Sequence, residues 1–433
     1  MIQMNKIKLS SKVNSFLQYI LLTIILIECN SVYSQLYRYH YYIRGSLIAI
    51  AILILLIFLV LGNKKKQVNT NIILNSIFYV LACSIIMLLN SDKLNGKIII
   101  ILIFMCFLPL MLLYISCLNR YELRSFLDKF VQIVFIISAV SLFFWIFGSI
   151  LKLISPINQL KVVWGKPYTL MDNYAFVYFD SKQVQDWVVT NMLIPRNISI
   201  FAEAPMFAFV ILVAMIFNNN FNSCILNKNK RIIINIIFII TLFSTISVTG
   251  VVCGLLLIFS NLMKFYNNLT TCKKKIFIII LVVFMLICLP TCIDLVQNKM
   301  STSSTSARIM DLKNGFHVFT ENPFIGKGIG HSRQFEDNVE TGYGYSNTII
   351  PALTDGGMIL TIIYLSPLIV YAIYIVKSKK INIYDIVMLL VYLIIIFTIA
   401  VQYRMLLMLL VCIIYYYFIF KIKNIKKLFW DKI

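Results

Sequence analysis

Long apolar runs separated by short lysine-rich linkers constrain this chain more than any other feature. A run of roughly 20 apolar residues crosses the hydrocarbon core of a bilayer as a helix. Of the 433 residues, 60% are hydrophobic and only 13% are charged, whereas soluble domains carry about 25% charged residues. The sequence therefore predicts an all-α polytopic membrane protein with about twelve transmembrane helices.

The apolar runs and two long polar loops divide the chain into five parts. We expect transmembrane helices 1–5 in residues 1–154, helices 6–9 in residues 198–293 and helices 10–12 in residues 346–433. The first long loop is expected in residues 155–197 and the second in residues 294–345. The individual spans are expected near residues 14–30, 45–62, 71–90, 98–118, 130–154, 198–217, 232–247, 250–264, 276–293, 346–376, 383–399 and 403–420. The run at 346–376 is too long for one crossing, so we expect a short first helix and a crossing from about Gly357.

The position of the positive charge predicts the orientation. The net charge of +22 would suit a nucleic-acid partner, but the lysines at 64–66 and 273–275 lie in short linkers between apolar runs. Such linkers remain in the cytoplasm. Placing both termini and these linkers there puts both long loops outside. We therefore expect a multi-pass protein surrounded by membrane lipid, with cytoplasmic termini and no nucleic-acid partner.

The second long loop combines an amphipathic helix with a glycine-rich turn. Helical spacing predicts one apolar face, formed by Ile309, Leu312, Phe316 and Phe319. N-cap candidates precede this helix at Ser303, Thr305 and Ser306, and Asn322-Pro323 ends it. The turn carries glycines and cations at Gly326, Lys327, Gly328, Gly330, His331 and Arg333, and Arg308 lies near the helix start. Backbone donors beside cations suit a phosphorylated ligand. A flexible turn with solvated charges is an equal alternative.

The end of the first loop places charge at the entry to an apolar run. Arg196 is expected at the outer interface, and Glu203 precedes Pro205. A carboxylate in such a run usually faces a cavity and has a partner. Glu203 could therefore mark the start of the helix and face a water-filled vestibule, or form a structural salt bridge with Arg196 or Arg404. Arg404, at the outer end of the last span, could be a site cation or could extend to the lipid headgroups, and the second interpretation is favoured.

Asp355 and Asn347 flank a short apolar stretch before Gly357. Asp355 could be a catalytic carboxylate or a cap on the following span. The histidines have no spacing typical of metal ligands, so no metal site and no cofactor are expected. The aromatic residues of the first loop could stack on sugar rings or form an interfacial belt.

Three segments resemble the O-antigen polymerase and O-antigen ligase superfamily of bacterial envelopes. They are RNISIFAEAPMFAF from Arg196, STISVTGVVCGLLLIF from Ser244, and the stretch from Ser306 to Gly357, which contains RIMDLKNGFHVFTENPFIGKGIG and YSNTIIPALTDGG. The order of these segments, together with the predicted topology, is more specific than any one of them.

The resemblance implies a glycosyltransferase C-type membrane fold and a glycan-transfer enzyme of lipopolysaccharide biosynthesis in the inner membrane. Its substrates would be oligosaccharides on undecaprenyl diphosphate, and a chain-length regulator would be a partner. In ligases of the family a His-Asn pair precedes the last glycine. Here Ser346 precedes Asn347, which favours a polymerase over a ligase. A lipid-linked oligosaccharide flippase is the rival from another class, but the polar residues concentrate outside the spans.

The expected mechanism assigns the loop residues to two roles. Diphosphate and glycan binding would fall to Arg196, Arg308, Arg333, Lys327, Gly326, Gly328, Gly330 and Asn347. Cations that stabilise the departing diphosphate could replace a metal. The base that activates the acceptor hydroxyl would be Glu203, His331 or Asp355, and the sequence does not rank them.

Overall fold

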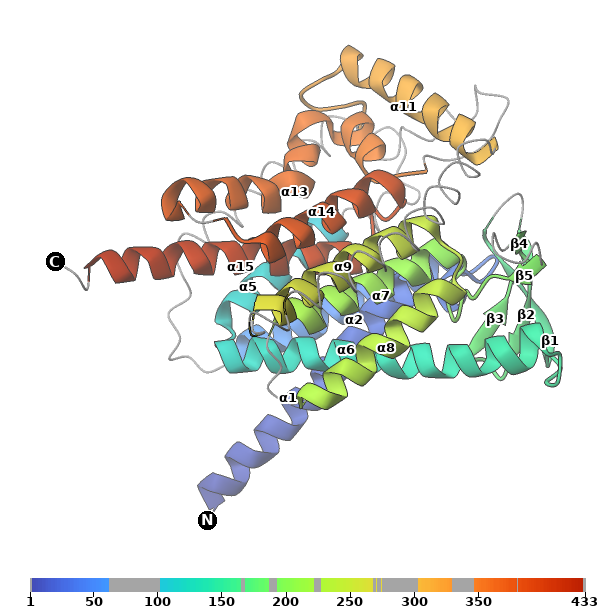
Figure 1. The fold of residues 1–433 in the computed structure, drawn as a ribbon, viewed down its shortest axis with the longest axis horizontal. Coiled ribbons are helices and arrows are strands. Elements are labelled where there is room, and N and C mark those ends of the chain that lie inside the picture. The colour runs from blue at the N-terminus through green and yellow to red at the C-terminus, as the bar shows by residue number, and fades with distance from the viewer. Residues whose placement is uncertain are drawn as a thin grey trace.

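The computed structural model describes residues 2–61, 102–164, 168–186, 193–221, 227–267, 270, 274, 303–328, 346–379 and 381–430. Its long helices run side by side, and the strands gather at one end of the bundle (Figure 1). The N-terminal end of α1 and the C-terminal end of α15 lie at the opposite end. The α-helices are α1 (Ile2–Glu28), α2 (His40–Leu61), α5 (Leu108–Cys117), α6 (Arg120–Phe144), α7 (Ala204–Asn220), α8 (Lys228–Ser244), α9 (Val248–Asn267), α11 (Ser303–Glu321), α13 (Ile349–Ser378), α14 (Ile383–Thr398) and α15 (Met405–Trp430).

Helices occupy most of each expected span that falls within the described residues, but α7 begins at Ala204, six residues after the expected start of its span. The spans expected at 71–90 and 276–293 lie outside those residues. Four helices are long and apolar enough to cross a membrane, at His40–Val60, Arg120–Ile150, Ile349–Ser378 and Met405–Ile422. Shorter apolar helices occupy Leu102–Cys117, Ala204–Asn220, Val248–Met263 and Ile383–Thr398. Two of these regions include π-helical turns, at Leu102–Phe107 and Trp145–Ile150. The chain is thus a mostly helical membrane protein.

The first long loop adds strands to the expected all-α fold. Strands β1 (Asn158–Val162), β2 (Thr169–Tyr174) and β3 (Tyr178–Asp180) form an antiparallel sheet in that order. Strands β4 (Val184–Asp186) and β5 (Leu193–Pro195) form a second antiparallel pair. Tyr178 and Phe179 are fully buried. Tyr178 stacks on Phe144 of α6 and Phe179 packs edge-on against Tyr33, so these two rings are not available for stacking on a ligand.

Two helices form the centre of the core. Helix α7 is apolar all round, as expected for a helix surrounded by protein, and its side chains from Met206 to Phe217 are buried. The first half of α15, from Met405 to Ile414, is equally buried. Both helices begin at the strand-bearing end of the bundle (Figure 1), and charged residues stand at both starts.

Helix α13 breaks where the sequence predicts it to. Gly357 has φ 58° and ψ −147°, which separates a short helix from the long one that follows. Almost only glycine adopts this backbone conformation. A Cβ at Gly357 would lie 2.6 Å from the carbonyl carbon and oxygen of Phe324. The break therefore also lets the turn after α11 approach the α13 backbone.

We expect Gly357→Ala to destabilise the protein by at least about 1–3 kcal/mol, because alanine is strained in this conformation and meets the Phe324 backbone. The thermal unfolding midpoint of the detergent-solubilised protein measures this loss. Gly45→Ala is the matched control, since no atom lies within 4 Å of its added Cβ. Equal midpoints for the two variants would show that the break is not needed for stability.

Candidate functional site

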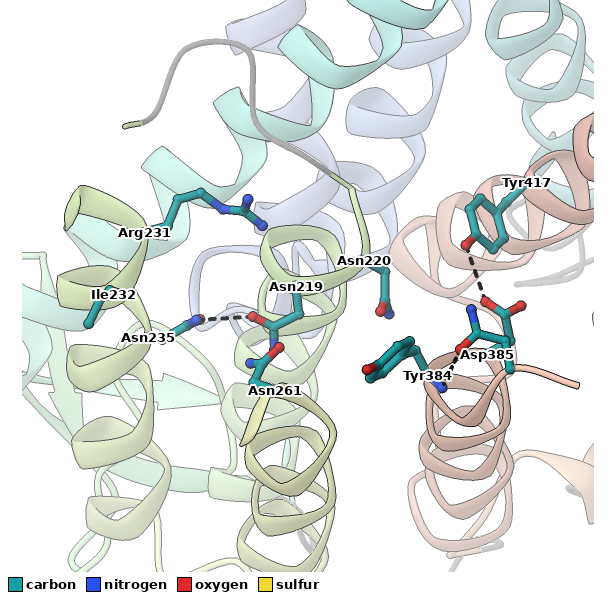
Figure 2. Close-up of a pocket in the computed structure, with 10 residues that line it drawn as sticks. Asn219, Asn220, Arg231, Ile232, Asn235, Asn261, Tyr384, Asp385 and Tyr417 are labelled. Carbon is teal, nitrogen blue, oxygen red and sulfur yellow. Dashed lines mark hydrogen bonds between the residues drawn. The ribbon is translucent and has the colours of Figure 1, made fainter. Parts of the chain in front are cut away.

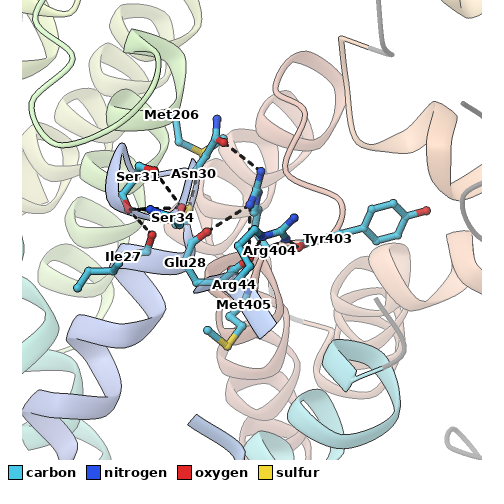
Figure 3. Close-up of polar contacts among 11 residues, drawn as sticks. Ile27, Glu28, Asn30, Ser31, Ser34, Arg44, Met206, Tyr403, Arg404 and Met405 are labelled. Atoms are coloured by element: carbon cyan, nitrogen blue, oxygen red, sulfur yellow. Dashed lines mark hydrogen bonds and ion pairs between the residues drawn. The ribbon is translucent and has the colours of Figure 1, made fainter. Parts of the chain in front are cut away.

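A buried ion-pair cluster lies at the start of α15. The Glu28 carboxylate, which is fully buried at the end of α1, accepts from Arg44 Nε at 3.1 Å and Nη2 at 2.8 Å. It also pairs with Arg404 Nη1 at 3.4 Å, and its Oε2 accepts from the Met405 backbone N–H at 3.0 Å (Figure 3). One carboxylate thus faces two guanidinium groups and the helix start, so the cluster keeps a net positive charge.

Arg404 is held inside the protein and does not extend to the headgroups, so that prediction is wrong. Its side chain is 15% exposed, and Nη2 donates to Asn30 Oδ1 at 3.1 Å. Burial lowers the pKa of Arg404 to about 10, which still leaves it charged at neutral pH. Sequence reasoning missed Glu28 and Arg44. The available signal was an acid at the end of the first apolar run and a base at the start of the second.

Glu203 is the N-cap residue of α7, and Pro205 occupies the first turn of that helix. This confirms that Glu203 marks the helix start. The Trp164 side chain hydrogen-bonds to its carboxylate, and the charges of three arginines act on it, namely Arg196, Arg404 and Arg308. Dehydration by the surrounding protein raises the pKa of Glu203, while Trp164 and the arginines oppose this rise. The side chain is nevertheless partly accessible.

Arg196 approaches Glu203 from the loop after β5. Its Nε donates to the Thr245 carbonyl at 3.2 Å, whereas its Nη2 is buried and has no hydrogen-bond partner among the described residues. The neighbouring Asn197 fixes this loop, because it bonds to Ser141 at 2.5 Å and to Ser244 at 2.9 Å. Burial lowers the pKa of Arg196, and the charge of Glu203 raises it. A buried guanidinium donor without an acceptor is suited to an anionic ligand.

The second loop contributes Arg308 from α11. Three residues later, Asp311 accepts from the Ser346 backbone N–H at 3.1 Å and from its hydroxyl at 3.0 Å. Asn347 is buried, and its Oδ1 accepts from the Ile350 N–H at 2.9 Å, which caps the short first helix of α13. The segment predicted as a candidate site thus anchors α11 to the start of α13.

The glycine-rich turn packs on the break in α13. The N–H groups of Lys327 and Gly328 donate to the carbonyls of Thr354 at 2.8 Å and Asp355 at 3.0 Å. Gly326 has φ 72°, and a Cβ there would lie 2.6 Å from the Asp355 carbonyl carbon. The close backbone approach expected for a ligand is therefore made to α13. The Lys327 ammonium pairs with Glu321.

The other predicted residues of this turn, Gly330, His331 and Arg333, lie outside the described residues. Asp355 is fully buried, and its carboxylate accepts from the Tyr403 hydroxyl. The Tyr403 carbonyl in turn accepts from Arg44 Nη2 at 3.1 Å, so Tyr403 connects Asp355 to the ion-pair cluster around Glu28.

A second polar region lies at the far end of α7. A cavity of about 470 Å³ opens there, lined by Asn219, Asn220, Arg231, Ile232, Asn235, Asn261, Asn382, Tyr384, Asp385 and Tyr417 (Figure 2). The Asp385 carboxylate pairs with Lys421 at 2.6 Å. Since α7 has 17 residues, roughly 25 Å of helix separates this cavity from Glu203. The cavity is therefore not part of the site formed by Glu203 and the three arginines Arg196, Arg308 and Arg404, which we call the arginine site.

The arrangement at the strand-bearing end can therefore bind an anion beside a carboxylate. A family model described as O-antigen ligase matches residues 232–365, a stretch that includes Arg308, the glycine-rich turn, Asn347 and Asp355. Comparisons with curated proteins and with solved structures found no match. The family match, together with the apolar helices, places the chain among glycan-transferring membrane proteins. Over residues 232–365 the chain matches the O-antigen polymerase and ligase superfamily.

Proposed function

We propose that this protein is an O-antigen repeat-unit polymerase of the bacterial cytoplasmic membrane. It transfers a glycan chain from undecaprenyl diphosphate onto the sugar of a new lipid-linked repeat unit at the outer face. The termini and the lysine-rich linkers lie in the cytoplasm, and the strand-bearing end faces outward. The family match supports glycan transfer in general, and the geometry of the arginine site supports the finer assignment.

One observation carries the proposal: Arg196 holds a buried guanidinium donor that has no acceptor among the described residues, and the charges of Arg196, Arg404 and Arg308 all act on Glu203. These residues come from three separate segments of the chain, since Arg196 and Glu203 lie only seven residues apart. A guanidinium group stays charged near lipid and matches the oxygen geometry of a phosphate. The site therefore suits the diphosphate of a lipid-linked glycan.

The chemical step uses the carboxylate and the cations together. A hydroxyl oxygen of the acceptor sugar forms a bond to the anomeric carbon of the donor chain, and the bond from that carbon to the diphosphate oxygen breaks. Glu203 takes the proton of the hydroxyl, and the undecaprenyl diphosphate leaves with the electron pair. The arginines stabilise the charge that develops on it. Of the described candidates for the base, Glu203 is partly accessible, whereas Asp355 is fully buried.

Ser346 favours a polymerase over the alternative, a ligase. Ligases of the family are expected to have histidine at this position, and here the Ser346 hydroxyl donates to Asp311 at 3.0 Å. Its role is thus to hold α11 in place. A flippase is a second alternative, which would require a transport path at mid-membrane depth.

Deleting the gene and examining the lipopolysaccharide on a gel tests the proposal. A polymerase deletion leaves a single repeat unit on the core, whereas the deletion of a ligase or a flippase leaves none. Complementation with Arg196→Ala is expected to restore the ladder poorly, because the loss of one donor to the developing charge costs roughly a hundredfold in rate.

Arg38→Ala, which removes an exposed arginine between α1 and α2, is the control and should restore the full ladder. A normal ladder from Arg196→Ala at normal protein levels would refute the role of Arg196. A deletion strain without any repeat unit on the core would refute the polymerase.

A further inference from the structure

Helix α11 has two different sides. One side packs on the short first helix of α13, where Gly315 lies against Ile350, Asp311 holds Ser346, and Val318 is 2% exposed. This packed side contains little apolar surface. The apolar positions of the helix lie mainly elsewhere, which is unusual for a helix that rests on a protein core.

The apolar positions form a stripe on an outward side of α11. Ile309, Leu312 and Phe316 are 51%, 46% and 59% exposed, and we call these three residues the α11 stripe. They fall within about 60° of one another around the helix, since successive residues turn by about 100°. The half-buried Phe319 extends the stripe, with its ring centroid 6.0 Å from that of Phe316.

The α11 stripe begins beside the arginine site. Arg308, whose charge acts on Glu203, directly precedes Ile309. From there the stripe follows the helix, which lies at the edge of the bundle beside α13 (Figure 1). A cation followed by a line of apolar side chains has the chemistry that complements an amphiphile with an anionic head and a long hydrocarbon chain.

We propose that the α11 stripe binds the isoprenoid chain of the lipid-linked substrate while the arginines hold its diphosphate. This inference rests on the proposed function and adds to it the residues that select a long polyprenyl carrier. The isoprenoid chain is the expected occupant, and not ordinary membrane lipid, because in the proposed function it is attached to the same diphosphate that the arginines bind.

Binding of undecaprenyl diphosphate and isopentenyl diphosphate, whose five-carbon chain is too short to reach Phe316, to the purified full-length protein in lipid nanodiscs tests the inference. The two ligands share a head group and differ in chain length. The variant with both Leu312→Ala and Phe316→Ala should reduce the preference for undecaprenyl diphosphate roughly tenfold, because it removes apolar contact from the long chain only. Comparing the variant with the wild type cancels the partitioning of each ligand into the bilayer.

Met310→Ala is the matched control. Met310 is 50% exposed but lies about 100° or more around the helix from each residue of the stripe, so the preference should not change. Phe316→Leu keeps an apolar side chain and serves as a milder variant, with a smaller change in the same direction, should the double variant fold poorly.

Three results would overturn the inference. Equal loss of affinity for both ligands would mean that the stripe acts through folding or through bilayer lipid. An unchanged preference would mean that it contacts no ligand chain. A change of oligomeric state in the double variant without a change of preference would assign the stripe to a second copy of the chain. Failure of the proposed function is distinguishable, because it appears as a deletion strain without any repeat unit on the core, whereas the binding preference is measured on the purified protein.

Discussion

Glu203→Gln is expected to abolish glycan transfer, with a loss of about 10²–10⁴-fold in rate, while the protein still folds. The amide keeps the shape of the side chain at the start of α7, but it cannot take a proton from the acceptor hydroxyl, and general bases contribute about this factor. The measurement is polymer formation from purified lipid-linked repeat units, together with the thermal unfolding midpoint. Glu321→Gln is the control, because Glu321 is an exposed carboxylate.

The pH dependence provides an independent check on Glu203. The base must be deprotonated, so activity should fall as the pH decreases through the pKa of Glu203. Burial raises that pKa, and the loss should therefore occur at a less acidic pH than for an ordinary glutamate. Arg308 lowers the same pKa, so Arg308→Ala should move the acidic limb of the rate profile further towards neutral pH. If the limb stays in place in Arg308→Ala, Glu203 is not the group that titrates.

Apolar run length predicts the helices well, because it depends only on local composition. The break at Gly357 was also predictable, since one run was too long for a single crossing. The strands of the first loop were not. They are three to six residues long, too short to produce a clear alternating pattern. Their pairing depends on contacts between residues that lie apart in the chain.

The candidate site was predicted in part. Sequence reasoning named Arg196, Glu203 and Arg308 as candidate site residues, and in the structure the charges of both arginines act on Glu203. It offered Glu203 or lipid as the partner of Arg404, but the paired carboxylate is Glu28, which lies 376 residues earlier. The spacing of residues along a sequence does not reveal ion pairs between residues that lie so far apart in the chain. The glycine-rich turn shows the same limit, since backbone freedom alone does not reveal whether a ligand or another helix approaches.

Glu28→Ala is expected to destabilise the protein more than any other single substitution considered above. It leaves Arg44 and Arg404, whose side chains are only 14% and 15% exposed, without their carboxylate. Breaking a buried ion pair costs about 3–5 kcal/mol. It also removes the acceptor of the Met405 N–H at the start of α15. The midpoint of thermal or denaturant unfolding in detergent, measured beside the wild type, should decrease strongly.

Two further variants separate the effect of unpaired charge from the effect of lost side-chain volume on the stability of Glu28→Ala. Glu28→Gln keeps the volume and one acceptor oxygen, yet removes the charge, and it should lose most of the same stability. Adding Arg44→Gln to Glu28→Gln removes one of the two unpaired cations and should recover part of the loss. Glu321→Ala breaks an exposed ion pair with Lys327 and should leave the midpoint unchanged. If Arg44→Gln added a further loss instead, the cost of Glu28→Gln would not come from unpaired buried charge.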